Sequence, residues 1–367
     1  MRVVLGLLLC CLLLGCAPTP APDDSDARVE PDSKAFRYVG RVDSADAGAY
    51  VLAGAATYVE FALDAEGTDV LLTAADYNVD STWAVAEVDG AYVGRYAAHH
   101  ADTLRLRIED ASAESGAERR VRIFHAAEQL MGRLVFHGTE GGRVSRHAGK
   151  PTRRVAFFGD SMSGGAASDI SAGPCSTGLS NANAYLAFPA RVGRALESDY
   201  VVHAASGRGL YTNWNGQDPP LPELLPHLYM DTAAAEPYRL SDFDADLAVV
   251  ALGTNDLNSA PDLRPEFDPA VFEATYRRFV DTLLAGYPRA ALALVGTPMH
   301  GGAKNDTLNA IIERVAAYAK TAHPGLTARA VPLEARELHG CPAGPHPSTE
   351  DHAAIAAEIV AGIEGML

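Results

Sequence analysis

The pattern of apolar residues changes near residue 152, and this change divides the chain into two parts of different fold class. Before it, short runs alternate apolar and polar side chains between turn residues such as Asp89-Gly90. Alternation with a period of two is typical of half-buried strands, and many short strands at this spacing favour a β sandwich. The predicted strands are 36–42, 58–63, 69–73, 82–88, 104–108, 120–124 and 134–136. We therefore expect residues 35–148 to form an all-β sandwich of the jelly-roll type.

After residue 152, short apolar runs alternate with longer stretches of helical pattern. The predicted strands are 155–158, 201–203, 247–252 and 291–295, and the predicted helices are 184–196, 271–285, 307–322 and 348–366. Strands that alternate with helices predict a parallel sheet with both faces covered. Residues 152–367 are thus expected to form a three-layer α/β/α domain, with its ligand site beyond the carboxyl ends of the strands.

The first 34 residues have the composition of an export signal followed by a linker. Arg2 precedes the apolar run 3–14, which is too short to span a bilayer comfortably. The run ends in Leu13-Leu14-Gly15-Cys16, which resembles the bacterial lipoprotein processing box. That resemblance implies a signal peptide of residues 1–16, cleaved before Cys16, which then carries lipid; an ordinary secretory signal is the alternative. Residues 17–34 are rich in Pro, Ala and Asp, as in a solvated linker.

Charge and cysteine content narrow the possible partners and the compartment. The net charge of −17 and the lack of a Lys/Arg-rich run in the sequence argue against binding to nucleic acid. With the signal removed and Cys16 lipidated, Cys175 and Cys341 remain in the folded part. In an exported protein these two form either one disulfide or two buried thiols. The expected location is the bacterial cell envelope, with membrane contact only through the lipid anchor.

Four short motifs follow predicted strands or precede the last predicted helix. They are Gly159-Asp160-Ser161, Ala205-Ser206-Gly207-Arg208-Gly209-Leu210, Leu252-Gly253-Thr254-Asn255-Asp256 and Gly344-Pro345-His346-Pro347-Ser348. Each alone indicates no more than a turn or a helix cap. Together they supply a hydroxyl, a backbone N–H beside glycine, an uncharged amide donor and an imidazole base. The sequence shows no His/Cys cluster with zinc spacing, and we expect neither a metal nor a cofactor.

The order Ser161, Gly207, Asn255 and His346 resembles the SGNH (GDSL-type) hydrolase superfamily, which is named after these four residue types. The resemblance implies that Ser161 and His346 are catalytic. It also implies that the N–H groups of Ser161 and Gly207 and the amide of Asn255 form an oxyanion hole. Asp160 is interpreted as a structural residue of the nucleophile turn.

A narrower set of residues is similar to carbohydrate esterase family 2. The set comprises Ser206-Gly207-Arg208-Gly209 with Tyr211-Thr212-Asn213, Gly340-Cys341 before His346-Pro347, Gly40-Arg41, and the segment 128–138. The resemblance implies a serine esterase that removes O-acetyl groups from a polysaccharide or oligosaccharide. Tyr211 and Trp214 are candidate sugar-binding residues, with simple packing as the alternative.

One position departs from the superfamily pattern. Three residues before His346, where an Asp is usual, the chain has Ala343. A backbone carbonyl, Glu334 or Glu337 could orient the imidazole instead. Two other functions stay open: a lipase or acylhydrolase of the same superfamily, and a catalytically idle glycan-binding protein.

Overall fold

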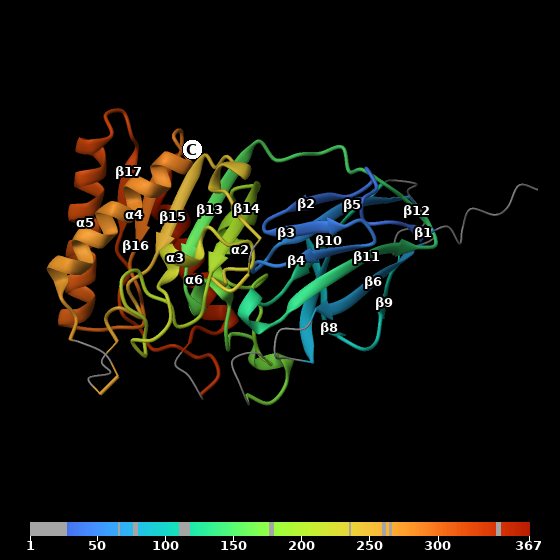
Figure 1. The fold of residues 1–367 in the computed structure, drawn as a ribbon, viewed down its shortest axis with the longest axis horizontal. Coiled ribbons are helices and arrows are strands. Elements are labelled where there is room, and N and C mark those ends of the chain that lie inside the picture. Colours follow the sequence, from blue (N-terminus) through green and yellow to red (C-terminus); the bar gives the residue numbers. More distant parts are fainter. Residues whose placement is uncertain are drawn as a thin grey trace, which may run out of the picture.

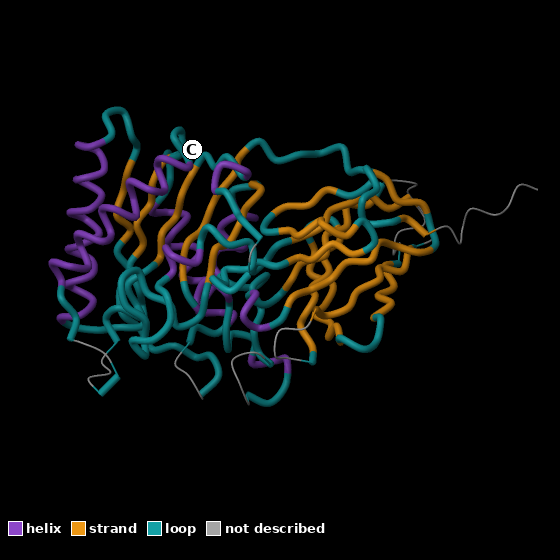
Figure 2. Tube along the Cα trace, viewed as in Figure 1, coloured by secondary structure: helices purple, strands orange, loops and turns teal. Residues whose placement is uncertain are grey.

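The computed structural model describes residues 28–367 except 65–66, 76–79, 110–117, 176–179, 235, 259–261, 264–265 and 343–345. The expected signal peptide and Cys16 lie outside the described residues. The expected linker of residues 17–34 does not reach residue 34, because β1 (Arg28–Val29) already pairs with β11 (Arg133–Glu140). Two antiparallel sheets form one half of the molecule and a parallel sheet with helices forms the other (Figures 1 and 2).

The antiparallel half begins with β1 and ends with β12. Besides β1 and β11, its strands are β2 (Arg37–Val39), β3 (Val42–Asp46), β4 (Ala49–Leu52), β5 (Tyr58–Asp64), β6 (Thr68–Ala75), β7 (Ser81–Val88), β8 (Ala91–His99), β9 (Leu104–Ile108), β10 (Arg119–His125) and β12 (Arg143–Ser145). In the described part, one sheet has the order β3-β4-β11-β6-β9 with β1 beside β11. The other has the order β12-β5-β10-β7-β8 with β2 beside β5.

The strands β4 to β11 pair in a nested way: β7 with β8, β6 with β9, β5 with β10 and β4 with β11. This is one long hairpin rolled into two sheets, the arrangement of a jelly roll. Between the sheets, Phe36 packs edge-on against Phe61 and Phe136, with ring centroids 5.6 and 4.9 Å apart. The predicted jelly-roll sandwich is confirmed.

Strand β8 was not expected from the sequence. Asp89 and Gly90 form the turn from β7 with φ values of 50° and 83°, the backbone that a two-residue hairpin requires. The turn residues were recognised, but most of β8 is exposed or half-buried, so its sequence lacks a clear apolar alternation. The short edge strand β17 (Ala328–Val331) was missed for a similar reason.

The second half contains a parallel sheet of five strands in the order β14-β13-β15-β16-β17. Its remaining strands are β13 (Arg153–Gly159), β14 (Ser198–Ala204), β15 (Leu247–Ala251) and β16 (Ala291–Val295). The helices are α1 (Ser161–Gly164), α2 (Phe188–Ala195), α3 (Leu221–Leu224), α4 (Pro269–Gly286), α5 (Ala303–Ala322) and α6 (Thr349–Gly362), with short 3₁₀ turns at Gln129–Met131, Ile170–Ala172 and Leu240–Asp242.

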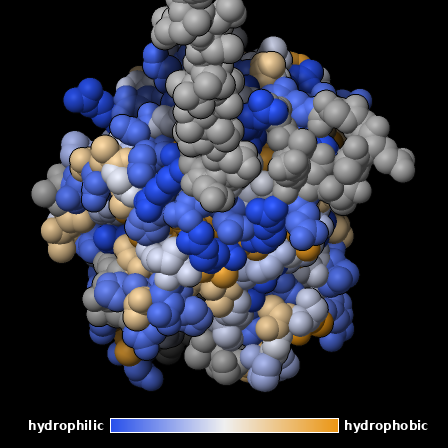
Figure 3. All heavy atoms as spheres, turned by 90° about the vertical axis from the view of Figure 1, so that its right-hand side faces the viewer, coloured by the Kyte–Doolittle hydropathy of each residue, from blue (hydrophilic) through white to orange (hydrophobic). Residues whose placement is uncertain are grey.

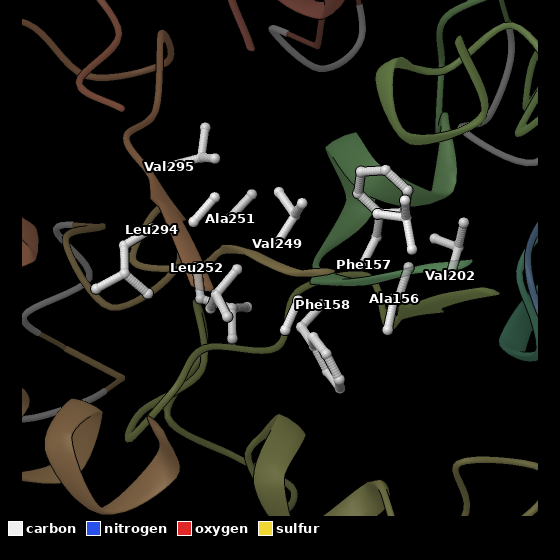
Figure 4. Packing of buried hydrophobic residues seen from close by; sticks show 14 of the residues in the cluster. Ala156, Phe157, Phe158, Val202, Val249, Ala251, Leu252, Leu294 and Val295 are labelled. Carbon is white, nitrogen blue, oxygen red and sulfur yellow. The ribbon is translucent and has the colours of Figure 1, made fainter. Parts of the chain in front are cut away.

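Helices cover both faces of this sheet. Phe157 and Phe158 of β13 point to opposite sides of the strand (Figure 4), as neighbouring residues of a strand must. Phe158 packs edge-on against Phe279 of α4, with 5.9 Å between ring centroids. Helix α4 packs against α5, and α2 packs against α6. The predicted three-layer α/β/α domain is confirmed.

Helix boundaries differ from the predicted ones by a few residues. Helix α2 begins at Phe188 rather than 184, with Pro189 in its first turn, a position that proline favours. Helix α5 begins four residues earlier than predicted, at Ala303, and α6 ends at Gly362 rather than 366. Helix α6 begins with a capping box: the Ser348 side chain accepts from the N–H of Asp351, whose carboxylate accepts from the N–H of Ser348.

The sandwich covers β14, the edge strand of the parallel sheet. An unpaired edge is a liability that proteins commonly cover. Here Ala55 of the sandwich forms an isolated bridge with Val202 of β14. Arg41, fully buried, donates from Nε to Nδ1 of His203 at 3.0 Å, and its guanidinium lies 3.9 Å from the ring centroid of Tyr238. The two domains are therefore joined through a shared buried core.

The outer end of the sandwich, away from the parallel sheet, shows mainly hydrophilic side chains among its described atoms (Figure 3). No helix in the described ranges is both long enough and apolar enough to cross a bilayer.

Three buried histidines should make stability depend on pH. Burial lowers the pKa of His125 to about 4, that of His352 to about 3, and that of His203 well below its ordinary value. At a pH below the ordinary histidine pKa of about 6.5, these side chains bind protons in the unfolded chain but stay neutral in the folded chain. The free energy of unfolding therefore decreases as the pH falls from about 6.5. We expect His352→Gln to reduce this pH dependence by at most about 1.4 kcal/mol per pH unit.

Chemical denaturation of the wild-type and variant proteins across this pH range measures the difference. His100→Gln is the matched control, because His100 is exposed and its replacement should leave the pH dependence unchanged. Parallel curves for His352→Gln and wild type would contradict the interpretation.

Candidate active site

Ser161 lies at the carboxyl end of β13, near the middle of the parallel sheet. The strand ends at Gly159, Asp160 caps α1, and Ser161 is the first residue of that helix. Oδ1 of Asp160 accepts from the N–H of Met162 at 3.1 Å. A side chain at position 159 would clash with the hydroxyl of Ser163, so glycine permits the sharp turn. The expected structural role of Asp160 matches this contact.

His346 reaches Ser161 from the segment before α6. Its Nε2 lies 2.8 Å from Oγ of Ser161, although 185 residues separate the two in sequence. The carbonyl of His346 accepts from the N–H of Gly340 at 3.0 Å, and Ser348, two residues later, caps α6. The base candidate is thus held between a backbone hydrogen bond and a helix cap.

A disulfide anchors the same segment. Cys341 is bonded to Cys175, with 5.3 Å between their Cα atoms, and its N–H donates to the carbonyl of Ala167 at 2.9 Å. Of the two alternatives for these cysteines, the structure therefore has the bridge. It ties the chain just before His346 to the loop that follows α1.

The group that orients the imidazole was predicted with three alternatives. Ala343 lies outside the described residues. Glu334 and Glu337 are exposed, and among the described contacts neither carboxylate bonds the ring of His346. These two candidates were wrong, because their side chains point to solvent. Orientation by a backbone carbonyl stays a prediction.

Gly207 lies in the loop after β14. We call residues 205–214 the Gly207 loop. Gly207 has a φ of 74°, and an added Cβ would approach Cδ1 of Trp214 to 2.5 Å, so only glycine fits without strain. Its carbonyl accepts from the N–H of Trp214 at 3.1 Å. Among the described contacts, the N–H groups of Gly207 and Ser161 have no protein acceptor. Both are therefore available to donate to an oxyanion.

Asn255 follows β15 and joins the other two loops. Its Nδ2 donates to Oδ2 of Asp160 at 3.1 Å and to the carbonyl of Arg208 at 3.0 Å. The structure thus brings all four motif residues to one edge of the sheet. In this state the Asn255 amide bridges the loops, so it would have to share or exchange one of these bonds to contact an oxyanion.

Sequence reasoning assigned no role to Asp256 and Asn213, although both lie within quoted motifs. Buried Asp256 accepts from three successive N–H groups of the Gly207 loop, those of Leu210, Tyr211 and Thr212, at 2.9, 2.9 and 3.1 Å. Oδ1 of Asn213 accepts from the N–H of Gly209 at 3.0 Å. A carboxylate directly after Asn255 was the available signal. These side chains fix the loop backbone that presents Gly207.

Burial dominates the electrostatics of these carboxyl groups. It raises the pKa of Asp160 to about 7 against the hydrogen bond from Met162, and the nearby charge of Asp256 acts in the same direction as burial. Burial also raises the pKa of Asp256, and the backbone N–H donors oppose it. Both groups face backbone donors of the site loops, so they hold loop geometry.

Among the described residues, no group of three or more His, Cys, Asp and Glu side chains is arranged to hold a metal ion.

The two aromatic candidates differ in their surroundings. Tyr211 is half-buried and its ring lies 6.5 and 6.4 Å from those of Phe267 and Phe272, which fits the packing alternative. Trp214 is 50% exposed and its indole lies against Gly207. Of the two, Trp214 is thus the one placed to meet a substrate.

Solved structures share this two-domain architecture. A family two carbohydrate esterase from Clostridium thermocellum, in complex with cellohexaose, aligns with a TM-score of 0.78 at 21% identity, covering 90% of this chain and 100% of that one. A family two carbohydrate esterase from Cellvibrio japonicus aligns with a TM-score of 0.78 at 22% identity, covering 93% of this chain and 98% of that one. At these identities the likeness establishes the fold, sandwich included.

Sequence comparison extends this likeness to the family. An acetylxylan esterase / glucomannan deacetylase from Cellvibrio japonicus is 28% identical over 258 residues, which are 67% of this chain and 66% of that protein. The alignments span just under two thirds or less of the length of such curated relatives. Residues 157–354, more than half of the chain, match the model of the GDSL-like lipase/acylhydrolase family. The matched range contains both Ser161 and His346, and the chain belongs to this family.

Proposed function

We propose that this protein is a serine esterase that removes O-acetyl groups from carbohydrate. The observation that carries the proposal is the 2.8 Å approach of His346 Nε2 to Ser161 Oγ, beside N–H groups of Ser161 and Gly207 that lack acceptors among the described contacts. A serine hydroxyl is a weak nucleophile until a base and an anion-stabilising pocket adjoin it.

The proposed reaction uses this geometry. His346 takes the Ser161 proton as Oγ attacks the acetyl carbonyl, and the N–H groups of Ser161 and Gly207 stabilise the tetrahedral oxyanion. His346 then protonates the leaving sugar oxygen, which leaves an acetyl group on Ser161. Water, activated by the same imidazole, attacks this ester and releases acetate.

Carbohydrate is proposed as the substrate class on two grounds. The named relative is an acetylxylan esterase / glucomannan deacetylase, and a solved structure of the same fold was obtained with cellohexaose. Trp214, half-exposed beside Gly207, offers an aromatic face of the kind that suits the apolar face of a sugar ring. A lipase of the same family and an idle glycan-binding protein are the competing functions.

Acetate release from a panel of acetylated polysaccharides tests the proposal most directly. We expect release from at least one member, and faster hydrolysis of p-nitrophenyl acetate than of the octanoate. A preference for octanoate would favour a lipase. Failure of a fluorophosphonate probe to label Ser161, with no hydrolysis of any ester, would favour an idle binder.

Asn255→Ala should lower kcat for acetyl-ester hydrolysis by about 10²- to 10³-fold if the amide donates to the oxyanion. The KM should change little, because the oxyanion forms only in the transition state. Steady-state kinetics with p-nitrophenyl acetate measures both constants. Asn258→Ala, three residues further along the chain, serves as the control. A rise in KM at unchanged kcat would instead assign Asn255 to substrate binding.

For location we propose an envelope lipoprotein with lipid on Cys16, on the strength of the processing-box resemblance alone. Metabolic labelling with a fatty acid should mark the wild-type chain and spare Cys16→Ser. Equal labelling of both, or of neither, would contradict the anchor.

A further inference from the structure

Glu128 is a residue of the sandwich that lies within the proposed esterase site. It directly precedes the 3₁₀ turn Gln129–Met131, between β10 and β11, and is 1% exposed. The N–H of Ser206 donates to both of its carboxylate oxygens, at 3.1 Å to Oε1 and 2.8 Å to Oε2. Ser206 is the residue immediately before Gly207. A side chain from one domain thus binds the loop that presents an oxyanion donor in the other.

The carboxylate of Glu128 lies between the Gly207 loop and α1, the short helix that begins with Ser161. A Cβ added at Gly164, the last residue of α1, would come within 3.2 Å of Oε2 of Glu128. The next residue, Gln129, donates from Nε2 to the carbonyl of Ala204 at 2.9 Å, at the very end of β14. Glu128 is therefore bonded to the Gly207 loop and lies close to α1, whereas Gln129 is bonded only to the end of β14.

This placement is energetically costly. Burial, with the nearby negative charge of Asp160 acting in the same direction, raises the pKa of Glu128 to about 7. The hydrogen bonds from Ser206 and the positive charge of Arg208 oppose the shift. Simple packing between domains would not require a buried carboxyl, because an apolar side chain fills such a space without the desolvation penalty. The bonds that oppose the penalty are those to the Gly207 loop.

We infer that Glu128 is a positioning residue, which fixes the Ser206–Gly207 backbone so that the Gly207 N–H faces the oxyanion and the sandwich completes the esterase site. This inference rests on the proposed function. The N–H of Ser206 is satisfied by Glu128, while the next N–H, that of Gly207, has no acceptor among the described contacts. Oxyanion donors act through preorganisation, and a misplacement of about 1 Å can cost about 10²-fold in rate.

The inference predicts different kcat values for three variants, each made in the full chain. Glu128→Ala removes the acceptor and should lower kcat about 10- to 100-fold with little change in KM. Glu128→Gln keeps a carbonyl acceptor for Ser206 and should stay within about threefold of wild type. Gln129→Met removes the neighbouring hydrogen bond between the domains but not the contact with Ser206, so its kcat should stay near that of wild type. Thermal unfolding of each variant reports its folding.

The rate of Ser161 labelling by a fluorophosphonate provides a second readout, because the phosphonyl oxygen occupies the same donors. Labelling should slow in Glu128→Ala and stay near the wild-type rate in Glu128→Gln and Gln129→Met. Equal losses in Glu128→Ala and Gln129→Met, or a Glu128→Ala variant with wild-type kcat and labelling, would overturn the inference. If wild type labels but hydrolyses no acetyl ester, the proposed function fails, while the labelling rates still decide the role of Glu128. Where Glu128→Ala does not fold, a Glu128→Gln variant as slow as Ser161→Ala would count against it.

Discussion

Replacing Ser161 by alanine is expected to lower kcat for hydrolysis of p-nitrophenyl acetate by about 10⁴-fold or more. The change removes the atom that forms the acyl intermediate in the proposed reaction, Oγ at 2.8 Å from His346 Nε2. The fold should remain intact, because the half-buried side chain is exchanged for a smaller one and Asp160 still caps α1. Initial rates, with circular dichroism as a check on folding, measure the effect.

Ser163→Ala is the matched control. It deletes a hydroxyl from the same short helix, but this one is buried under the turn and is not part of the proposed chemistry. The control should retain most of its activity. Turnover by Ser161→Ala at a rate close to wild type would refute the assignment of the nucleophile.

Replacing His346 by alanine is expected to reduce kcat by a similar factor, about 10⁴-fold, because without a base the hydroxyl must lose its proton to water. The deletion leaves space next to Ser161, so free imidazole in the buffer should restore part of the activity. Kinetics measured as a function of imidazole concentration, at constant pH and ionic strength, tests this rescue.

His339→Ala separates loss of the base from loss of any imidazole in the segment. His339 lies seven residues before His346, is exposed, and is hydrogen-bonded to Asp351. This control should keep its kcat. If His346→Ala were as active as wild type, or if imidazole stimulated Ser161→Ala equally, the assignment of His346 as the base for Ser161 would not stand.

The sequence was sufficient for the fold because each domain repeats one simple pattern. Buried runs such as 155–158 and 247–252 predicted the parallel sheet, and the strands alternating around Phe61 and Ile123 predicted the sandwich. Strand β8 escaped detection, because a strand at the edge of a sheet buries too little of either face to leave an alternating signature. Helix starts shifted where a proline or glycine, rather than apolar periodicity, determines the first turn.

Site residues that lie in a short sequence motif could be predicted, whereas a residue whose role depends on a contact distant in the sequence could not. Ser161 and His346 sit in motifs with a mechanism, and their order in the chain indicated the family. The role of Glu128 depends on contact with Ser206, 78 residues away in the other domain, and nothing in its own segment signals that contact. Glu334 and Glu337 were candidates because a carboxylate could take the role of the usual Asp, yet both side chains are exposed to solvent.

Mass spectrometry of the rapidly acid-quenched reaction with p-nitrophenyl acetate tests the central claim, that Ser161 carries the acetyl group between its two transfers. We expect an acetylated peptide containing Ser161 in the wild-type digest and its absence from Ser161→Ala. Acetate formation without any acetylated Ser161 peptide, or an acetyl group on another residue of a still active Ser161→Ala variant, would contradict it.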